Sequence, residues 1–90
     1  DIIRLESEGN YTDFLLRGNR KIVVTRTLKE YEALLAPLGF FRVHHSHIVN
    51  LNHINRYVRG DGGYLVLSDG SNVDVSRRRK DDFLAHLPFL

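Results

Sequence analysis

The sequence contains no cysteine and no long apolar run, and each absence removes a class of protein. Without cysteine the chain has neither a disulfide framework nor a thiolate metal site. No apolar run approaches the roughly 20 residues that a membrane-spanning helix needs. The first residues also lack the charged and then apolar pattern of a signal peptide. We therefore expect a soluble protein in a cytoplasmic setting, without a membrane partner.

The chain has 90 residues, which is enough for one compact core and too few for a second. We therefore expect a single domain over residues 1–90. Its formal net charge is only +2, but the charge is uneven. Residues 41–80 contain seven Lys/Arg against three Asp/Glu, a balance of +4, whereas six basic and six acidic residues cancel over residues 1–40. The excess lies in the half that contains most of the histidines, which favours an anionic partner there.

Short strands separated by turn residues dominate the pattern. Alternating apolar residues predict strands at residues 2–6, 11–17, 20–25, 42–43, 48–51, 56–59, 64–68 and 73–75. Gly18-Asn19 is a two-residue hairpin connection, because both residues tolerate positive φ, and Asp69-Gly70 is a second turn of this kind. The strands are therefore expected to pair antiparallel.

Two helices interrupt the strands. Thr27 and Glu30 have the spacing of a capping box, so a helix should begin there and end near Pro37-Leu38-Gly39. A terminal helix capped by Ser76 should follow residue 76, with Phe83, Leu84 and Leu87 as its buried side. The predicted fold class is mostly β, with one central and one C-terminal helix.

Three of the five histidines lie close together, at positions 44, 45 and 47. If this stretch is one extended strand, alternation places His45 and His47 on one face and His44 on the other. At most two could then ligate one ion locally, whereas zinc takes three or four protein ligands. A metal site is disfavoured, and a His-dependent metal-binding or protein-interaction signalling module is kept as the alternative function.

Enzyme motifs are also missing from the sequence. It contains no Gly-x-Ser-x-Gly nucleophile elbow, and the glycine-rich residues 60–63 lack the lysine of a phosphate-binding loop. We therefore expect neither catalysis nor a cofactor.

The four consecutive cations at positions 77–80 are the strongest physical signal. At the start of a helix they oppose the macrodipole, whose positive end prefers acids. DNA phosphates would compensate for that cost, and arginine can also hydrogen-bond guanine edges. The alternative is a solvated helical face partly offset by Asp81 and Asp82.

Five landmarks in order then resemble the LytTR family of bacterial transcription-regulator domains. They are Glu8-Gly9-Asn10-Tyr11, Thr27-Leu28-Lys29-Glu30, Phe41-Arg42-Val43-His44 with Ser46 and Ile48-Val49-Asn50, Leu67-x-Asp69-Gly70, and Val75-Ser76-Arg77-Arg78. The resemblance implies three small antiparallel sheets in an elongated stack, following the receiver domain of a two-component response regulator. It also implies that loops between strands bind double-stranded DNA at promoter repeats, where a homodimer is one open arrangement.

Carried over residue by residue, the resemblance implies two groups of DNA contacts. Base or groove contacts are expected from Asn10, Tyr11, His44, His45 and Arg78. Phosphate contacts, which position a protein without specifying sequence, are expected from Arg77, Arg79 and Lys80.

The sequence departs from the family pattern in two ways. Relatives often have arginine or lysine where this chain has His45, so an imidazole that is mostly neutral near pH 7 replaces a permanent charge. The family's domain commonly begins about one strand earlier, so we expect this chain to lack that first strand. Ser46 and Asn50 are expected to hold the turn after the reading segment through side-chain hydrogen bonds.

Overall fold

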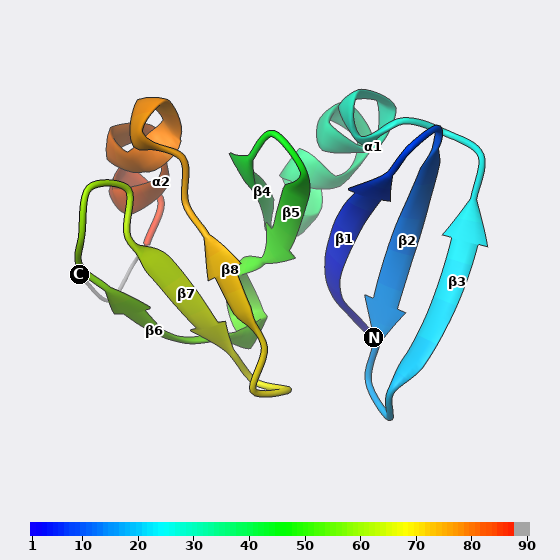
Figure 1. Ribbon diagram of the computed structural model, residues 1–90, viewed down its shortest axis with the longest axis horizontal. Helices are drawn as coiled ribbons and strands as arrows, with labels where there is room; N and C mark the ends of the chain where they lie inside the picture. The colour runs from blue at the N-terminus through cyan, green and yellow to red at the C-terminus, as the bar shows by residue number, and fades with distance from the viewer. Residues whose placement is uncertain (88–90) are drawn as a thin grey trace.

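The computed structural model describes residues 1–87 (Figure 1). These residues form eight strands, two α-helices and three short 3₁₀ turns. The strands are β1 (Ile2–Glu8), β2 (Tyr11–Leu16), β3 (Arg20–Val24), β4 (Phe40–His44), β5 (His47–Asn50), β6 (Ile54–Val58), β7 (Tyr64–Leu67) and β8 (Asn72–Asp74). The helices are α1 (Leu28–Leu35) and α2 (Lys80–Ala85), and the 3₁₀ turns are η1 (Ala36–Leu38), η2 (Leu51–His53) and η3 (Arg77–Arg79).

The described strands form two antiparallel sheets, of order β3-β2-β1-β5-β4 and β6-β7-β8. The predicted mostly β fold with a central and a C-terminal helix is therefore confirmed. The number of sheets differs from the three that the resemblance implied. Strand β1 pairs with β5 from Arg4 opposite Val49 to Glu6 opposite His47, and this pairing joins two smaller units into one sheet. The principal extents are 33 × 26 × 23 Å, so the elongation is modest.

Two hairpin turns lie together at the lower edge of Figure 1. The antiparallel pairing of β2 with β3 confirms the predicted hairpin, in which Gly18 and Asn19 have φ of 75° and 63°. The connection has three residues, 17–19, rather than the predicted two, because Leu16 pairs with Arg20. Asp69 and Gly70 connect β7 to β8, where the Asp69 carboxylate accepts a hydrogen bond from the Ser71 N–H at 3.0 Å.

Helix α1 begins and ends where the sequence predicts. The Glu30 carboxylate accepts a hydrogen bond from the Thr27 N–H at 3.0 Å, the reciprocal bond of a capping box. At the other end η1 tightens the chain, and Gly39 stops it in the left-handed region at φ 90°. The helix buries Leu28 against Leu5 and Ile48 of the five-stranded sheet.

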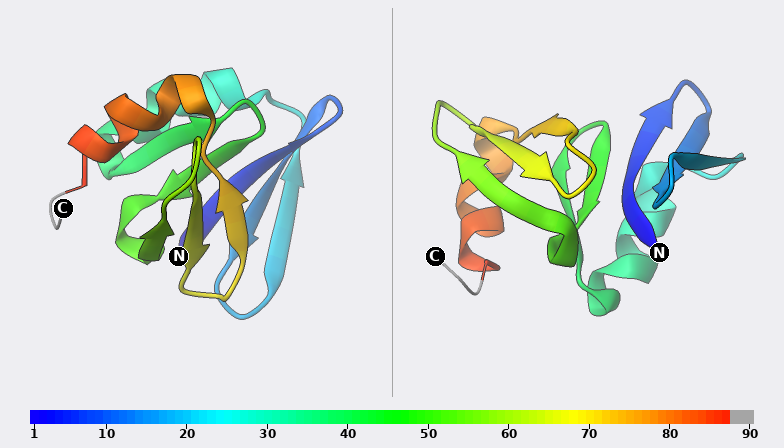
Figure 2. Two further views of the ribbon diagram at one scale, coloured as in Figure 1. Left: turned by 60° about the vertical axis from the view of Figure 1, so that its left-hand side comes forward. Right: turned by 90° about the horizontal axis from the view of Figure 1, so that it is seen from below.

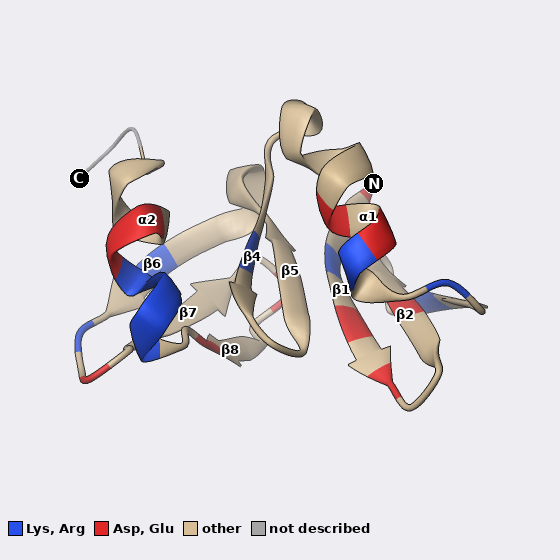
Figure 3. Ribbon diagram, turned by 90° about the horizontal axis from the view of Figure 1, so that it is seen from above, with Lys and Arg blue, Asp and Glu red and all other residues tan. Residues whose placement is uncertain are grey.

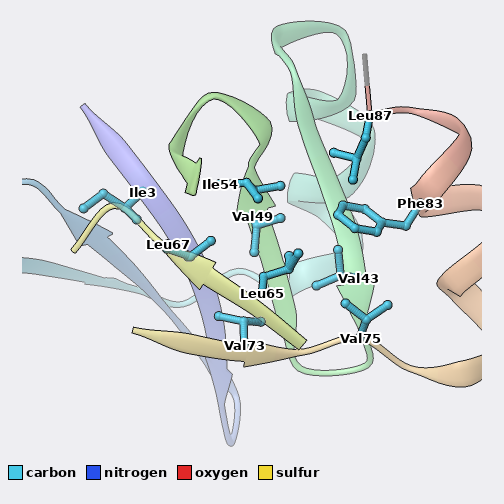
Figure 4. Close-up of a cluster of buried hydrophobic side chains, with 10 residues drawn as sticks. All are labelled: Ile3, Val43, Val49, Ile54, Leu65, Leu67, Val73, Val75, Phe83 and Leu87. Carbon is cyan, nitrogen blue, oxygen red and sulfur yellow. The ribbon is translucent and has the colours of Figure 1, made fainter. Parts of the chain in front are cut away.

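A larger apolar cluster joins both sheets to α2 (Figure 4). Its side chains come from β1, β4 and β5 on one side and from the three-stranded sheet and α2 on the other. They are Ile3, Val43, Val49, Ile54, Leu65, Leu67, Val73, Val75, Phe83 and Leu87. Phe83 is fully buried and Leu84 is half-buried, as expected for the inner side of α2. This core fixes α2 relative to β4.

The histidine stretch is not one extended strand, so the predicted alternation of faces is wrong. Strand β4 ends at His44, the chain turns at His45 and Ser46, and β5 begins at His47. His44 therefore lies opposite His47, with ring centroids 5.4 Å apart. The terminal helix also differs slightly, because η3 precedes α2 and Ser76 caps η3 through its carbonyl, which accepts from the Arg79 N–H.

Candidate nucleic-acid interface

The predicted contact residues gather along one edge of the molecule, the upper edge in Figure 1. Three segments form this edge: the β1–β2 turn with Asn10, the β4–β5 turn with His45, and η3 with Arg78. The left view of Figure 2 shows the same three segments side by side. We call these three segments the reading edge. They come from the N-terminal, central and C-terminal parts of the chain.

The pairing of β1 with β5 places the first two turns next to each other. Beyond the Glu6–His47 pair, the Ser7 N–H donates a hydrogen bond to the Ser46 carbonyl at 3.0 Å. A surface hollow between the two turns and the start of α1 has Tyr11 and His45 in its lining. The structure thus brings these two predicted contact residues to one site.

The third segment is attached to β4. The Ser76 N–H donates to the Val43 carbonyl at 2.8 Å, so η3 begins beside the strand that leads into the β4–β5 turn. Figure 3 shows the basic η3 followed directly by the acidic first turn of α2. Asp81 and Asp82 lie in that turn, where carboxylates suit the positive end of the helix dipole.

The predicted contact residues differ in exposure. Asn10, Tyr11, His45, Arg77 and Arg78 are exposed, and half of the Tyr11 surface is accessible. The other three, His44, Arg79 and Lys80, are half-buried. The exposed group is free to meet a ligand at the reading edge without any rearrangement.

The cationic run is therefore divided into two parts. Arg79 Nη1 lies 3.7 Å from a Glu32 carboxylate oxygen and donates to the Arg42 carbonyl at 3.3 Å. Lys80 Nζ donates to the Gly60 carbonyl at 3.3 Å. Both side chains thus have partners within the protein, whereas Arg77 and Arg78 project into solvent. The phosphate contacts expected of Arg77, Arg79 and Lys80, and the base contact expected of Arg78, remain predictions.

The β4–β5 turn is held by the side chains of Arg42, which was not predicted as a site residue, and His44, which was. Arg42 Nη2 donates to the His45 carbonyl at 2.6 Å, and its Nη1 pairs with Glu32 at 3.2 Å. The Ser46 N–H donates to His44 Nδ1 at 3.1 Å, so Ser46 acts through its backbone rather than its hydroxyl. The signal for Arg42 was present in the sequence, because a charge inside an apolar strand needs a partner.

Asn50 holds the chain after β5, as the sequence predicted. Its Nδ2 donates to the Ile2 carbonyl at 2.8 Å, and its Oδ1 accepts from the Asn52 N–H at 3.0 Å. The side chain thereby ties η2 to the start of β1, well away from the reading edge. Its role is that of a scaffold.

His47, which lies opposite His44 in the β4–β5 hairpin, is half-buried. Burial away from water is the main cause that lowers the pKa of His47 below 6.5, and nearby Arg4 and His44 act in the same direction, whereas Glu6 and Asp74 oppose it. Its Nδ1 is buried without a hydrogen-bond partner among the described residues. The imidazole is accordingly neutral at pH 7.

Two features are absent from the described residues, 1–87. No three His, Asp or Glu side chains gather there in a way that could hold a metal ion. No helix in that part of the chain is long and apolar enough to cross a membrane.

Comparisons with known proteins match nearly the whole chain. Residues 1–88 fit the family described as the LytTr DNA-binding domain. A LytTr DNA-binding domain from a Bacillus cereus response regulator has a similar structure, with a TM-score of 0.87 and 29% sequence identity over 98% of this chain and 82% of that one.

Two curated regulators are similar in sequence. The heme-containing CO-sensing transcriptional regulator RcoM 1 of Paraburkholderia xenovorans (strain LB400) is 35% identical over 82 residues, which are 88% of this chain. The transcriptional regulatory protein LytR of Staphylococcus aureus (strain N315) is 35% identical over 74 residues, or 80% of this chain. The chain spans only 30% of the length of each relative.

Proposed function

The chain belongs to the LytTr DNA-binding domain family, and we propose that it binds double-stranded DNA sequence-specifically as the non-enzymatic output domain of a bacterial transcriptional regulator. One structural observation supports this proposal in addition to the family membership. The exposed residues of the reading edge come from three separate segments that the fold aligns on one side, and exposed Arg77 and Arg78 give that side its positive charge.

The proposed mechanism separates docking from reading. Arg77 pairs with phosphates and draws the domain to any duplex, whereas Arg78 reaches a guanine edge, where two parallel hydrogen bonds are available. His45 reads a base from the neighbouring turn. Asn10 and Tyr11 contact the next groove, and the tyrosine can pack its ring while its hydroxyl meets a phosphate. His44 supports the turn from behind.

The curated relatives suggest the larger setting. Because the chain spans 30% of their length, we infer that it functions as one domain of a longer cytoplasmic protein. A receiver domain preceding it, as in a two-component response regulator, would control how it reaches promoter repeats. A pair of copies on adjacent repeats would double the reading surface.

Two substitutions test the mechanism, after bound sequences have been selected from a random duplex pool. Arg78→Ala should weaken binding to the selected site by about 1–3 kcal/mol and relax the preference at one base pair. Arg77→Ala should weaken binding to all duplexes alike and reduce the slope of affinity against salt by about one ion. Both effects are measured by fluorescence anisotropy at several salt concentrations.

The outcomes separate clearly. An unchanged preference in Arg78→Ala would remove Arg78 from the reading role. If the unaltered protein shows no salt-dependent binding to any duplex, the proposed function itself is wrong.

A further inference from the structure

We propose that Glu32, Arg42 and Arg79 form an internal ion cluster that sets the separation between the β4–β5 turn and η3, and through that separation the base-pair spacing that the domain reads. The inference rests on the proposed DNA-binding function and assigns these three residues a positioning role in it. In Figure 3, strand β4 lies between helix α1 and the segment that forms η3 and α2.

One carboxylate joins two arginines from different elements. Glu32 on α1 lies with Oε1 3.2 Å from Arg42 Nη1 on β4 and with Oε2 3.7 Å from Arg79 Nη1 on η3. Each oxygen therefore faces its own guanidinium. The three side chains connect helix α1 and the nearby strand β4 to η3, which is distant from both in the sequence.

Each arginine also bonds to the backbone of the hairpin. Arg42 Nη2 donates to the His45 carbonyl at 2.6 Å, and Arg79 Nη1 donates to the Arg42 carbonyl at 3.3 Å. The first bond fixes the turn that presents His45. The second fixes η3, which presents Arg78. A displacement of Glu32 would therefore move both reading segments relative to each other.

Burial restricts the two guanidinium groups of the cluster. The Arg42 side chain is 12% exposed and the Arg79 side chain 28% exposed, whereas the Glu32 side chain that they share is 40% exposed. The planar guanidinium offers donors in a fixed fork, which constrains direction as well as distance. Recognition groups must be held to within about 0.5 Å of their working geometry, and base contacts at two adjacent segments need this precision together.

The cluster also gives Arg79 a different role from its two neighbours in η3. Its guanidinium is engaged with Glu32 and a carbonyl, whereas the neighbouring Arg77 and Arg78 are exposed. Arg79 thus acts through the position of η3. A phosphate contact would demand that this side chain leave Glu32, with the carboxylate then facing the DNA backbone.

Glu32→Gln separates an electrostatic effect from a positioning effect, because the two predict opposite changes in affinity for the selected site. Removal of a negative charge beside the reading edge should strengthen binding to every duplex if charge alone matters. If the cluster positions the reading segments, affinity for the selected site should instead fall about tenfold, while affinity for random duplex stays equal or rises. Glu8→Gln is the matched control, because Glu8 is exposed at the same edge and outside the cluster; it should leave the preference intact.

Arg79→Lys is the second variant and preserves the charge. It should reduce the preference for the selected site, since a lysine cannot span both Glu32 and the Arg42 carbonyl with a planar fork. An unchanged preference in Glu32→Gln and Arg79→Lys, with thermal unfolding confirming that both are folded, would overturn the cluster. Absence of any sequence preference in the unaltered protein would instead overturn the proposed function, so the two failures are distinguishable.

Discussion

The two turns of the five-stranded sheet at the reading edge are neighbours of equal length, yet different forces hold them. The β1–β2 turn uses Gly9, whose φ of 61° lies in the left-handed region that glycine occupies easily. Neither residue of the β4–β5 turn, His45 and Ser46, has a positive φ. Two-residue hairpins favour turns with positive φ because these match the strand twist, so the second turn needs other support.

Side chains supply that support. The Arg42 guanidinium holds the His45 carbonyl, and the His44 ring accepts from the Ser46 N–H. The first turn is thus determined by local backbone preference, whereas the second depends on where α1 and η3 pack. A change in the packing of α1 or η3 therefore acts directly on the second turn, through Glu32, Arg79 and Arg42.

Arg42→Ala, which removes the side chain that holds the second turn, should have the largest effect on stability. Loss of the hydrogen bonds from a mostly buried guanidinium to His45 and Glu32 should lower the free energy of unfolding by about 2–3 kcal/mol. Urea unfolding measures this, and amide exchange should show the Ser7 N–H, which is bonded to Ser46, exchanging faster. Arg26→Ala, at an exposed arginine, is the control and should change stability by no more than about 0.5 kcal/mol. Equal losses in both variants would contradict the special role of Arg42.

Gly9→Ala tests the other turn and should have a smaller effect. A Cβ at Gly9 would meet no atom within 4 Å, so the cost is the left-handed backbone alone, about 1 kcal/mol. Gly9→Asn should cost less, because asparagine tolerates this region. Urea unfolding of the two variants side by side gives the difference. If both variants are as stable as the unaltered protein, the first turn does not depend on its backbone conformation.

The smallest effect should come from pH acting at His47, beside the second turn. Because burial lowers the pKa of His47 in the folded state below 6.5, the unfolded chain binds a proton first as pH falls. The stability contributed by neutral His47 is therefore fully present above pH 6.5 and lost as the pH falls toward the folded-state pKa. Urea unfolding between pH 7.5 and 5 should show a steeper loss in the unaltered protein than in His47→Gln. Identical slopes would contradict the prediction.

Local signals in the sequence were sufficient for much of the fold. Gly18-Asn19 and the Thr27–Glu30 capping box specify a turn and a helix start within a few residues, and the structure has both. The β4–β5 turn escaped prediction because His45 and Ser46 are weak turn formers inside an apolar β pattern. The face that each histidine occupies follows from this turn, which is why the assumed alternation was wrong.

In the candidate site, too, some features follow from local sequence and others depend on tertiary packing. The cationic run at residues 77–80 is visible in the sequence, and the fold brings it to the same side of the molecule as the β1–β2 and β4–β5 turns. The split between exposed and engaged arginines was not predictable, because Glu32 meets Arg79 only after α1 and η3 have packed on either side of β4. Tertiary contacts of this kind leave no periodic pattern.

The β2–β3 hairpin, at the edge opposite the reading segments (Figure 1), has a practical consequence. The chain has no cysteine, so a single thiol introduced by Arg20→Cys, at an exposed position at the start of β3, would be the only labelling site. A fluorophore there would lie far from a bound duplex and would report the slower tumbling of the complex without blocking it. The hairpin thus offers an attachment point for single-molecule work.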